Sequence, residues 1–219
     1  MLGIIEYVFR IRDKLEKYGE WLENFNKNVF NGFNAVYNAL TLTLELLNYY
    51  YNVWTSYDVS RLSPDEIDRL RKENAERVIE ITRWAFVHTM SIIEFSIKNS
   101  LEFINPSILR SIRTRKSKGR KHKRVHIHLR DIIKELKRRR CIGDDVYNNW
   151  LVLIEIRNLV VHNNTIADSD KVLYIGGMNI QLVKNQMLKG ELNFFVKLID
   201  HAIESYKQTM EKLPNCRST

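Results

Sequence analysis

The feature that most constrains this chain is a long run of helical periodicity with few interruptions. Apolar residues recur every three or four positions over much of its 219 residues, which include only eight glycines and three prolines. Glycine and proline are the residues that most often break helices and form turns, so their scarcity favours long helices joined by few loops. We therefore predict an all-α protein.

The first sixty residues predict a helical hairpin. Residues 4–28 and a second stretch ending at Trp54 carry apolar residues at helical spacing, and Gly32 interrupts the second stretch. The wide apolar face has two interpretations: packing against the main core, or a surface for a partner or a second copy, where Tyr and Trp are enriched. We assign residues 1–60 to this hairpin, whose role the sequence does not indicate, and residues 61–213 to the main helical domain.

The main domain begins with a strong helix start. Ser63 can act as N-cap, Pro64 suits the first helical position, and Glu66 completes a capping box, so a helix should run to about Leu101. Further along the chain, helical spacing returns over residues 125–140 and 191–213. Between these, residues 172–182 contain Gly176-Gly177 flanked by apolar runs and predict a small β-hairpin.

Positive charge is concentrated in one segment, residues 107–124. The net charge is +9, and residues 110–124 hold nine Lys and Arg and no acid. Removing these nine from the 35 Lys and Arg leaves 26, which equals the number of Asp and Glu. Such a segment favours a polyanionic partner over a generally basic surface. Residues 114–124 have no apolar side chain and predict a loop or an extended arm.

We expect phosphate contacts from eight cations of this segment, although a solvated loop without a role is the plainer interpretation. They are Arg113, Arg115, Lys116, Lys118, Arg120, Lys121, Lys123 and Arg124. The segment has no aromatic residue for stacking on bases and no apolar anchor for a membrane.

Neither the histidines nor the cysteines predict a metal site. His126 and His128 are two residues apart and would diverge on a helix, and Cys141 and Cys216 match no metal-ligand spacing. The N-terminus has no basic region followed by an apolar core, and no stretch approaches the length of a membrane span. We expect a cytoplasmic protein with two reduced thiols, no cofactor and no membrane partner.

The central stretch, residues 150–164, places polar residues in an otherwise apolar run. Between Leu151 and His162 only Glu155, Arg157, Asn158 and His162 are not apolar. On a helix, Glu155, Asn158 and His162 share one face, and the long side chain of Arg157 can reach the same end. Polar groups in such a run are costly to bury without partners, so we take them as the candidate site.

These residues carry a resemblance to a known family. The sequence from Arg157 to His162 (R-N-L-V-V-H) resembles the R-N-x-x-x-H motif of the HEPN (higher eukaryotes and prokaryotes nucleotide-binding) superfamily. Glu94, four residues before Lys98, is similar to the acidic position on the second core helix of such domains. The resemblance covers roughly residues 65–212. The first sixty residues have no counterpart in it, and residues 107–124 look like an insertion.

The resemblance implies an up-and-down four-helix bundle and a metal-independent endoribonuclease. It also implies a homodimer with the two motifs facing each other, and a toxin or antiviral-defence effector that can pair with an antitoxin. In this interpretation the 2′-OH of RNA attacks the adjacent phosphate. His162 transfers a proton, Arg157 binds the phosphate, Asn158 orients His162 or donates to a phosphate oxygen, and Glu94 positions Arg157 or His162.

Plainer interpretations remain open for each part of this site. Glu94 and Lys98 have the spacing of a simple intrahelical ion pair. The polar set at the end of the central stretch can be a helix end that turns to solvent. The alternative function is a non-catalytic nucleic-acid-binding or protein-interaction module, because many members of the family have lost the motif.

Overall fold

The computed structural model describes residues 1–23, 27–117 and 126–216. Its helices, in chain order, are α1 (Leu2–Glu23), α2 (Lys27–Thr55), α3 (Pro64–Ile104), α4 (Pro106–Ser117), α5 (Leu129–Arg138), α6 (Asp144–Asn163) and α7 (Phe194–Lys212). Short 3-10 helices lie at Val59–Arg61 and Leu213–Asn215. The predicted all-α class is confirmed, with one small two-stranded sheet formed by β1 (Lys171–Ile175) and β2 (Met178–Leu182).

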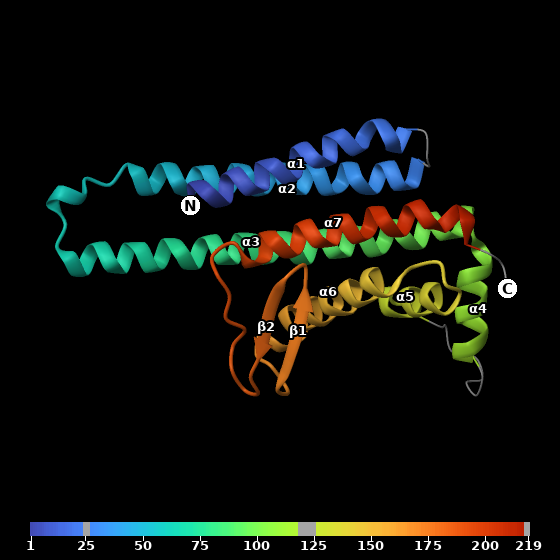
Figure 1. The fold of residues 1–219 in the computed structure, drawn as a ribbon. Coiled ribbons are helices and arrows are strands. Elements are labelled where there is room, and N and C mark those ends of the chain that lie inside the picture. The colour runs from blue at the N-terminus through green and yellow to red at the C-terminus, as the bar shows by residue number, and fades with distance from the viewer. Residues whose placement is uncertain (24–26, 118–125, 217–219) are drawn as a thin grey trace.

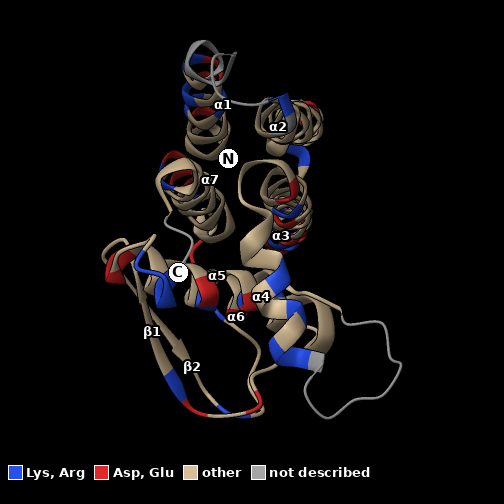
Figure 2. Cartoon of the chain, turned by 90° about the vertical axis from the view of Figure 1, so that its right-hand side faces the viewer, with Lys and Arg blue, Asp and Glu red and all other residues tan. Residues whose placement is uncertain are grey.

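The four helices α1, α2, α3 and α7 run alongside one another. Figure 2 views them close to end-on, and Figure 1 shows α5, α6 and the β-hairpin on the far side of α3 and α7 from the N-terminal hairpin. Helix α4 turns away sharply after α3 (Figure 1). Buried residues from all of these helices form one hydrophobic cluster, so residues 1–60 share a core with residues 61–213.

Helix α3 begins as its sequence predicts and forms the longest rod of the fold. The side chain of Ser63 accepts a hydrogen bond from the backbone N–H of Glu66, and the Glu66 carboxylate accepts one from the N–H of Ser63, which completes the capping box. The helix continues to Ile104, three residues beyond the predicted end. It stops at Asn105, because Pro106 disfavours the helical conformation in the residue before it.

Gly32 does not interrupt α2, which runs through it without a break. A Cβ at this position would collide with the side chain of Ser96 on α3 and with the hydroxyl of Tyr206 on α7. The glycine therefore permits a close approach of three helices. The expectation of a break was wrong because the same residue type serves close helix packing, which depends on the fold around it.

Ion pairs fasten α1 to α7 beside this packing. Lys14 Nζ lies 3.0 Å from Asp200 Oδ1 and 2.9 Å from Glu204 Oε2, and the hydroxyl of Tyr18 donates to the same Glu204 oxygen at 2.9 Å. Burial opposes the charge of Lys14, but its hydrogen bonds to the two carboxylates raise its pKa above the usual value. The N-terminal hairpin is thus held to the last helix by polar as well as apolar contacts.

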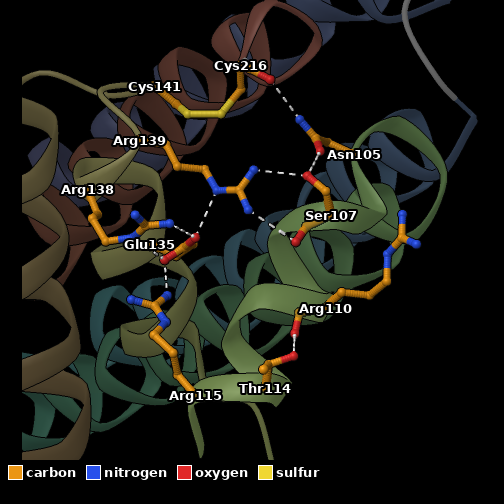
Figure 3. A network of polar contacts seen from close by, with 10 residues as sticks. All are labelled: Asn105, Ser107, Arg110, Thr114, Arg115, Glu135, Arg138, Arg139, Cys141 and Cys216. Atoms are coloured by element: carbon orange, nitrogen blue, oxygen red, sulfur yellow. Dashed lines mark hydrogen bonds and ion pairs between the residues drawn. A yellow bond between two sulfur atoms is a disulfide. The ribbon is translucent and has the colours of Figure 1, made fainter. Parts of the chain in front are cut away.

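The basic helix α4 is tied to α5 by a buried carboxylate (Figure 3). The Glu135 side chain is fully buried and accepts hydrogen bonds from Arg115, Arg138 and Arg139. Arg139 also donates to the hydroxyl of Ser107 at 2.9 Å and to its carbonyl at 3.2 Å. Residues 114–117 are therefore helical, not the loop we expected, because residues without apolar side chains gain their order here from ion pairs.

The two cysteines form a disulfide, which corrects the expectation of two reduced thiols. Cys141 follows α5 and Cys216 follows the last 3-10 helix, and their Cα atoms lie 5.1 Å apart. The carbonyl of Cys216 also accepts a hydrogen bond from the Asn105 side chain at 2.8 Å (Figure 3). The two residues are 75 positions apart in the sequence, so only the fold could reveal their proximity.

Candidate functional site

Helix α6 carries the central stretch and ends at Asn163. Trp150 and Leu153 are fully buried, and the Trp150 Nε1 donates to the hydroxyl of Thr209 on α7 at 2.9 Å. The helix terminates at Asn164, whose φ of 49° places it in the left-handed conformation that commonly ends helices. With one side of α6 packed on α7, Arg157 and Asn158 are half-buried and His162 is exposed in the last turn.

A cavity of about 560 Å³ joins residues from three parts of the chain. Helix α3 contributes Met90 and Glu94, and α6 contributes Ile154, Arg157, Asn158 and His162. The remaining wall comes from the start of α5 and the segment before it, through His126, His128, Leu129, Arg130 and Asp131. All four residues that we predicted to be catalytic therefore line one cavity.

Among the described residues, Arg157 is a cation without an acidic partner. Its Nη1 donates to the Asn158 Oδ1 at 3.3 Å, and no carboxylate of the described residues lies within ion-pair distance of it. The acids of the cavity are neutralised elsewhere, since Glu94 pairs with Lys98 and Asp131 with Lys116. A half-buried guanidinium that lines a cavity together with an exposed imidazole is suited to bind an anion such as a phosphate.

Glu94 has different partners from those we expected. Its Oε1 accepts a hydrogen bond from Lys98 Nζ at 2.7 Å and from the backbone N–H of Leu129 at 3.1 Å. The intrahelical ion pair with Lys98 is present, and across the described residues no hydrogen bond joins Glu94 to Arg157 or His162. Glu94 thus holds the N-terminal end of α5, where backbone N–H groups lack partners within the helix.

Glu155 lies outside the cavity, although its spacing placed it on the face of Asn158 and His162. Its carboxylate binds Arg130 Nη2 at 3.2 Å and Lys171 Nζ at 2.6 Å. These contacts link α6 to α5 and to β1. The polar character of Glu155 is therefore explained by ion pairs between elements.

His126 and His128 also line this cavity, although from the sequence we considered them only as metal ligands and set that role aside. We expected residues 125–140 to be helical, but α5 begins at Leu129 and the backbone of His128 is extended, with φ −98° and ψ 160°. The two rings stack with centroids 5.3 Å apart and an interplanar angle of 21°, and both line the cavity. Their i, i+2 spacing was a signal, because alternate residues of an extended segment point to the same side.

The predicted RNA-binding cations divide into two groups. Arg115 and Lys116 form ion pairs with Glu135 and Asp131, and Arg113 lies 3.8 Å from Glu102. Figure 2 shows Lys and Arg along α4. The other five, Lys118, Arg120, Lys121, Lys123 and Arg124, lie outside the described residues. Within α4, then, internal pairing reduces the charge available to an external phosphate, most of all for Arg115 and Lys116.

In residues 1–23, 27–117 and 126–216 no group of three or more His, Cys, Asp or Glu side chains is arranged to hold a metal ion. Over the same ranges, no helix combines the length and apolar character needed to cross a bilayer.

Comparison with known proteins adds no assignment to this geometry. No protein-family model, curated protein or solved structure matches the chain.

Proposed function

We propose that this protein is a metal-independent endoribonuclease of the HEPN type. The observation that carries the proposal is the cavity that unites Arg157, Asn158, His162 and Glu94, with Arg157 free of any acidic partner among the described residues. The R-N-x-x-x-H resemblance predicts an active site from three of these residues. The structure supports the proposal by adding a cavity that can admit a phosphodiester and a cation available to bind it.

In the proposed reaction the 2′-OH of a ribonucleotide attacks the phosphorus of its own 3′-phosphodiester. The bond from O2′ to phosphorus forms, the bond from phosphorus to O5′ breaks, and the products are a 2′,3′-cyclic phosphate and a 5′-OH. Arg157 stabilises the negative charge that grows on the non-bridging oxygens, and Asn158 accepts a hydrogen bond that holds the guanidinium in place. His162 transfers one of the two protons, since an imidazole titrates near neutral pH.

The architecture and the partners implied by the resemblance belong to the same proposal. The HEPN-like bundle would consist of α3, α5, α6 and α7, and a second copy of the chain would face the cavity in a homodimer. The protein would act as a toxin or antiviral-defence effector, restrained by an antitoxin or another defence partner. RNA would approach along the basic segment, where α4 contributes Arg113.

The decisive experiment measures cleavage of a mixed RNA pool by the purified protein in the presence of EDTA. We expect cleavage in EDTA, with 2′,3′-cyclic phosphate ends, and a loss of roughly 10²–10⁴-fold in rate for His162→Ala. Arg157→Ala should reduce the rate by a similar factor because it removes charge stabilisation in the transition state.

Matched controls lie on α3. His88→Ala removes an exposed imidazole that stacks on Trp84 outside the cavity, and Arg71→Ala removes an exposed guanidinium. Both should cleave like the unmodified protein. Cleavage that persists unchanged in His162→Ala would overturn the proposal, and salt-sensitive RNA binding without cleavage would assign a non-catalytic binding module instead.

A further inference from the structure

Imidazoles reach the cavity from two separate elements. His162 enters from the last turn of α6, whereas His126 and His128 enter from the segment that leads into α5. The two rings of the second group are exposed. Exposed imidazoles can exchange protons with a molecule bound in the cavity.

The backbone beneath these rings is fixed by side chains of three elements. Asp131 Oδ2 accepts a hydrogen bond from the N–H of His128 at 2.9 Å and forms an ion pair with Lys116 on α4. Lys116 Nζ also donates to the carbonyl of His126 at 3.0 Å. The next N–H, that of Leu129, is held by Glu94 on α3. Because this backbone is fixed, the two exposed rings are held in place at the cavity and can act on a molecule bound there.

The charge of Asp131 is maintained by the same contacts. Partial burial disfavours the ionised carboxyl, but the hydrogen bond from Lys116 and that from the His128 backbone together keep the pKa of Asp131 below its usual value. Asp131 therefore stays ionised at neutral pH. It fixes the start of α5 through charge-assisted hydrogen bonds, which are stronger than neutral ones.

The proposed cleavage moves two protons. One leaves the 2′-OH as O2′ bonds to phosphorus, and one must reach O5′ as the bond from phosphorus to O5′ breaks. One imidazole cannot accept the first and donate the second in a single step, whereas two imidazoles in opposite protonation states can. After the step their protonation states are exchanged, and solvent restores them.

We infer that His128 is the second proton-transfer group of this site, acting with His162, and that His126 stacks on it to set the orientation of its ring. The inference rests on the proposed ribonuclease function. His128 is chosen over His126 because its own N–H and the N–H of the following residue are both held by carboxylates. Glu94 and Asp131 are then positioning residues, since they act through the backbone of the histidine segment.

The test is the pH dependence of cleavage of a short RNA with one scissile bond, measured in EDTA under single-turnover conditions. The unmodified protein should give a bell-shaped profile, because one imidazole must be neutral and one protonated. Charged and titratable groups around the pair are the same in every variant: Glu94, Lys98, Lys116, Arg130, Asp131 and Arg157.

In His128→Ala we expect the rate to fall by roughly 10²–10⁴-fold, with one limb of the bell lost and the affinity for RNA retained. His128→Gln keeps a polar side chain at the start of the helix and should show the same loss of rate as His128→Ala. An equal loss in both variants would show that proton transfer is missing and that the fold is intact. His126→Ala should lower the rate less and keep both limbs. His88→Ala is the control imidazole.

A substrate with sulfur in place of O5′ assigns the two roles, because a thiolate leaves without a proton. This substrate should restore the rate of one of the variants His128→Ala and His162→Ala and not of the other. Restoration of both or of neither would overturn the pairing.

The ribonuclease function and the role of His128 can be rejected separately. Absence of cleavage by the unmodified protein would reject the ribonuclease function itself. Cleavage that requires His162, but proceeds at full rate with both limbs in His128→Ala, would reject only the role of His128.

Discussion

The buried charge of Glu135 is compensated by partners both near to it and far from it in the sequence. Glu135 has a fully buried carboxylate in an amphipathic helix, and it is compensated by Arg115 and by its neighbours Arg138 and Arg139. Burial and the nearby Arg138 lower the pKa of Arg139. A buried ion pair contributes little net stability in itself, but the loss of one partner leaves a buried charge uncompensated.

Glu135→Gln should lower the free energy of unfolding by about 3 kcal/mol, near the lower end for breaking a buried ion pair. The reason for the lower end is that Arg115 and Arg138 are half-exposed and can turn to water, whereas Arg139 is 3% exposed and cannot. Urea unfolding at neutral pH measures the change. Glu76→Gln, on the exposed face of α3, is the control and should change stability by less than about 0.5 kcal/mol. Equal stabilities of the two variants would show that Glu135 does not organise its arginines.

Helices are positioned in this fold by contacts at their ends and by the points where neighbouring helices approach most closely. Carboxylates of Glu94 and Asp131 hold the start of α5, which places the histidine segment against α6. Gly32 lets α2 approach the side chains of Ser96 and Tyr206, and the hydroxyls of these two residues are within hydrogen-bonding distance of each other. Both features depend on atoms of other helices, so each helix is specified in part by its neighbours.

Gly32→Ala should lower the free energy of unfolding by about 1–3 kcal/mol, because the added methyl group must displace buried atoms in a packed core. Gly3→Ala is the matched control, since a Cβ there meets nothing within 4 Å. In a helix this change alone should be neutral or stabilising by up to about 1 kcal/mol. Thermal unfolding followed by circular dichroism compares the two. If the Gly32→Ala protein were as stable as the Gly3→Ala protein, the close approach of α2 to α3 and α7 at Gly32 would be refuted.

At the scale of the whole molecule, one core and one covalent link join distant parts of the chain. The N-terminal hairpin packs on α3 and α7 and is tied to α7 through Lys14 and Tyr18. The disulfide joins the turn after α5 to the end of the described chain and lies beside Arg139 and Asn105 (Figure 3). The cavity depends on this assembly, because its walls come from α3, α6 and the start of α5.

The Cys141–Cys216 disulfide should stabilise the protein by about 2–4 kcal/mol, because it restricts the unfolded chain over a 75-residue separation. Urea unfolding with and without a phosphine reductant measures this difference in the unmodified protein. The double variant Cys141→Ser, Cys216→Ser should unfold at the same urea concentration as the reduced unmodified protein, and the reductant should not change that concentration. A midpoint that reductant leaves unchanged in the unmodified protein would contradict the link.

The sequence by itself determined the features that depend on neighbours along the chain. Periodicity, capping and turn chemistry predicted the helical class, the Ser63 cap and the β-hairpin at Gly176-Gly177. The sequence also singled out Arg157, Asn158, His162 and Glu94 as candidates. Local rules suffice here because each interaction involves residues a few positions apart.

Only the tertiary structure decided what distant residues do to one another. It joined the two cysteines and placed Gly32 where three helices approach closely. It also extended α4 through ion pairs with α5 and brought His126 and His128 to the cavity. It also redirected Glu94 to the start of α5. The reason is physical: burial, steric contact and charge pairing depend on distance in space, and the spacing of residues along a chain does not encode that distance.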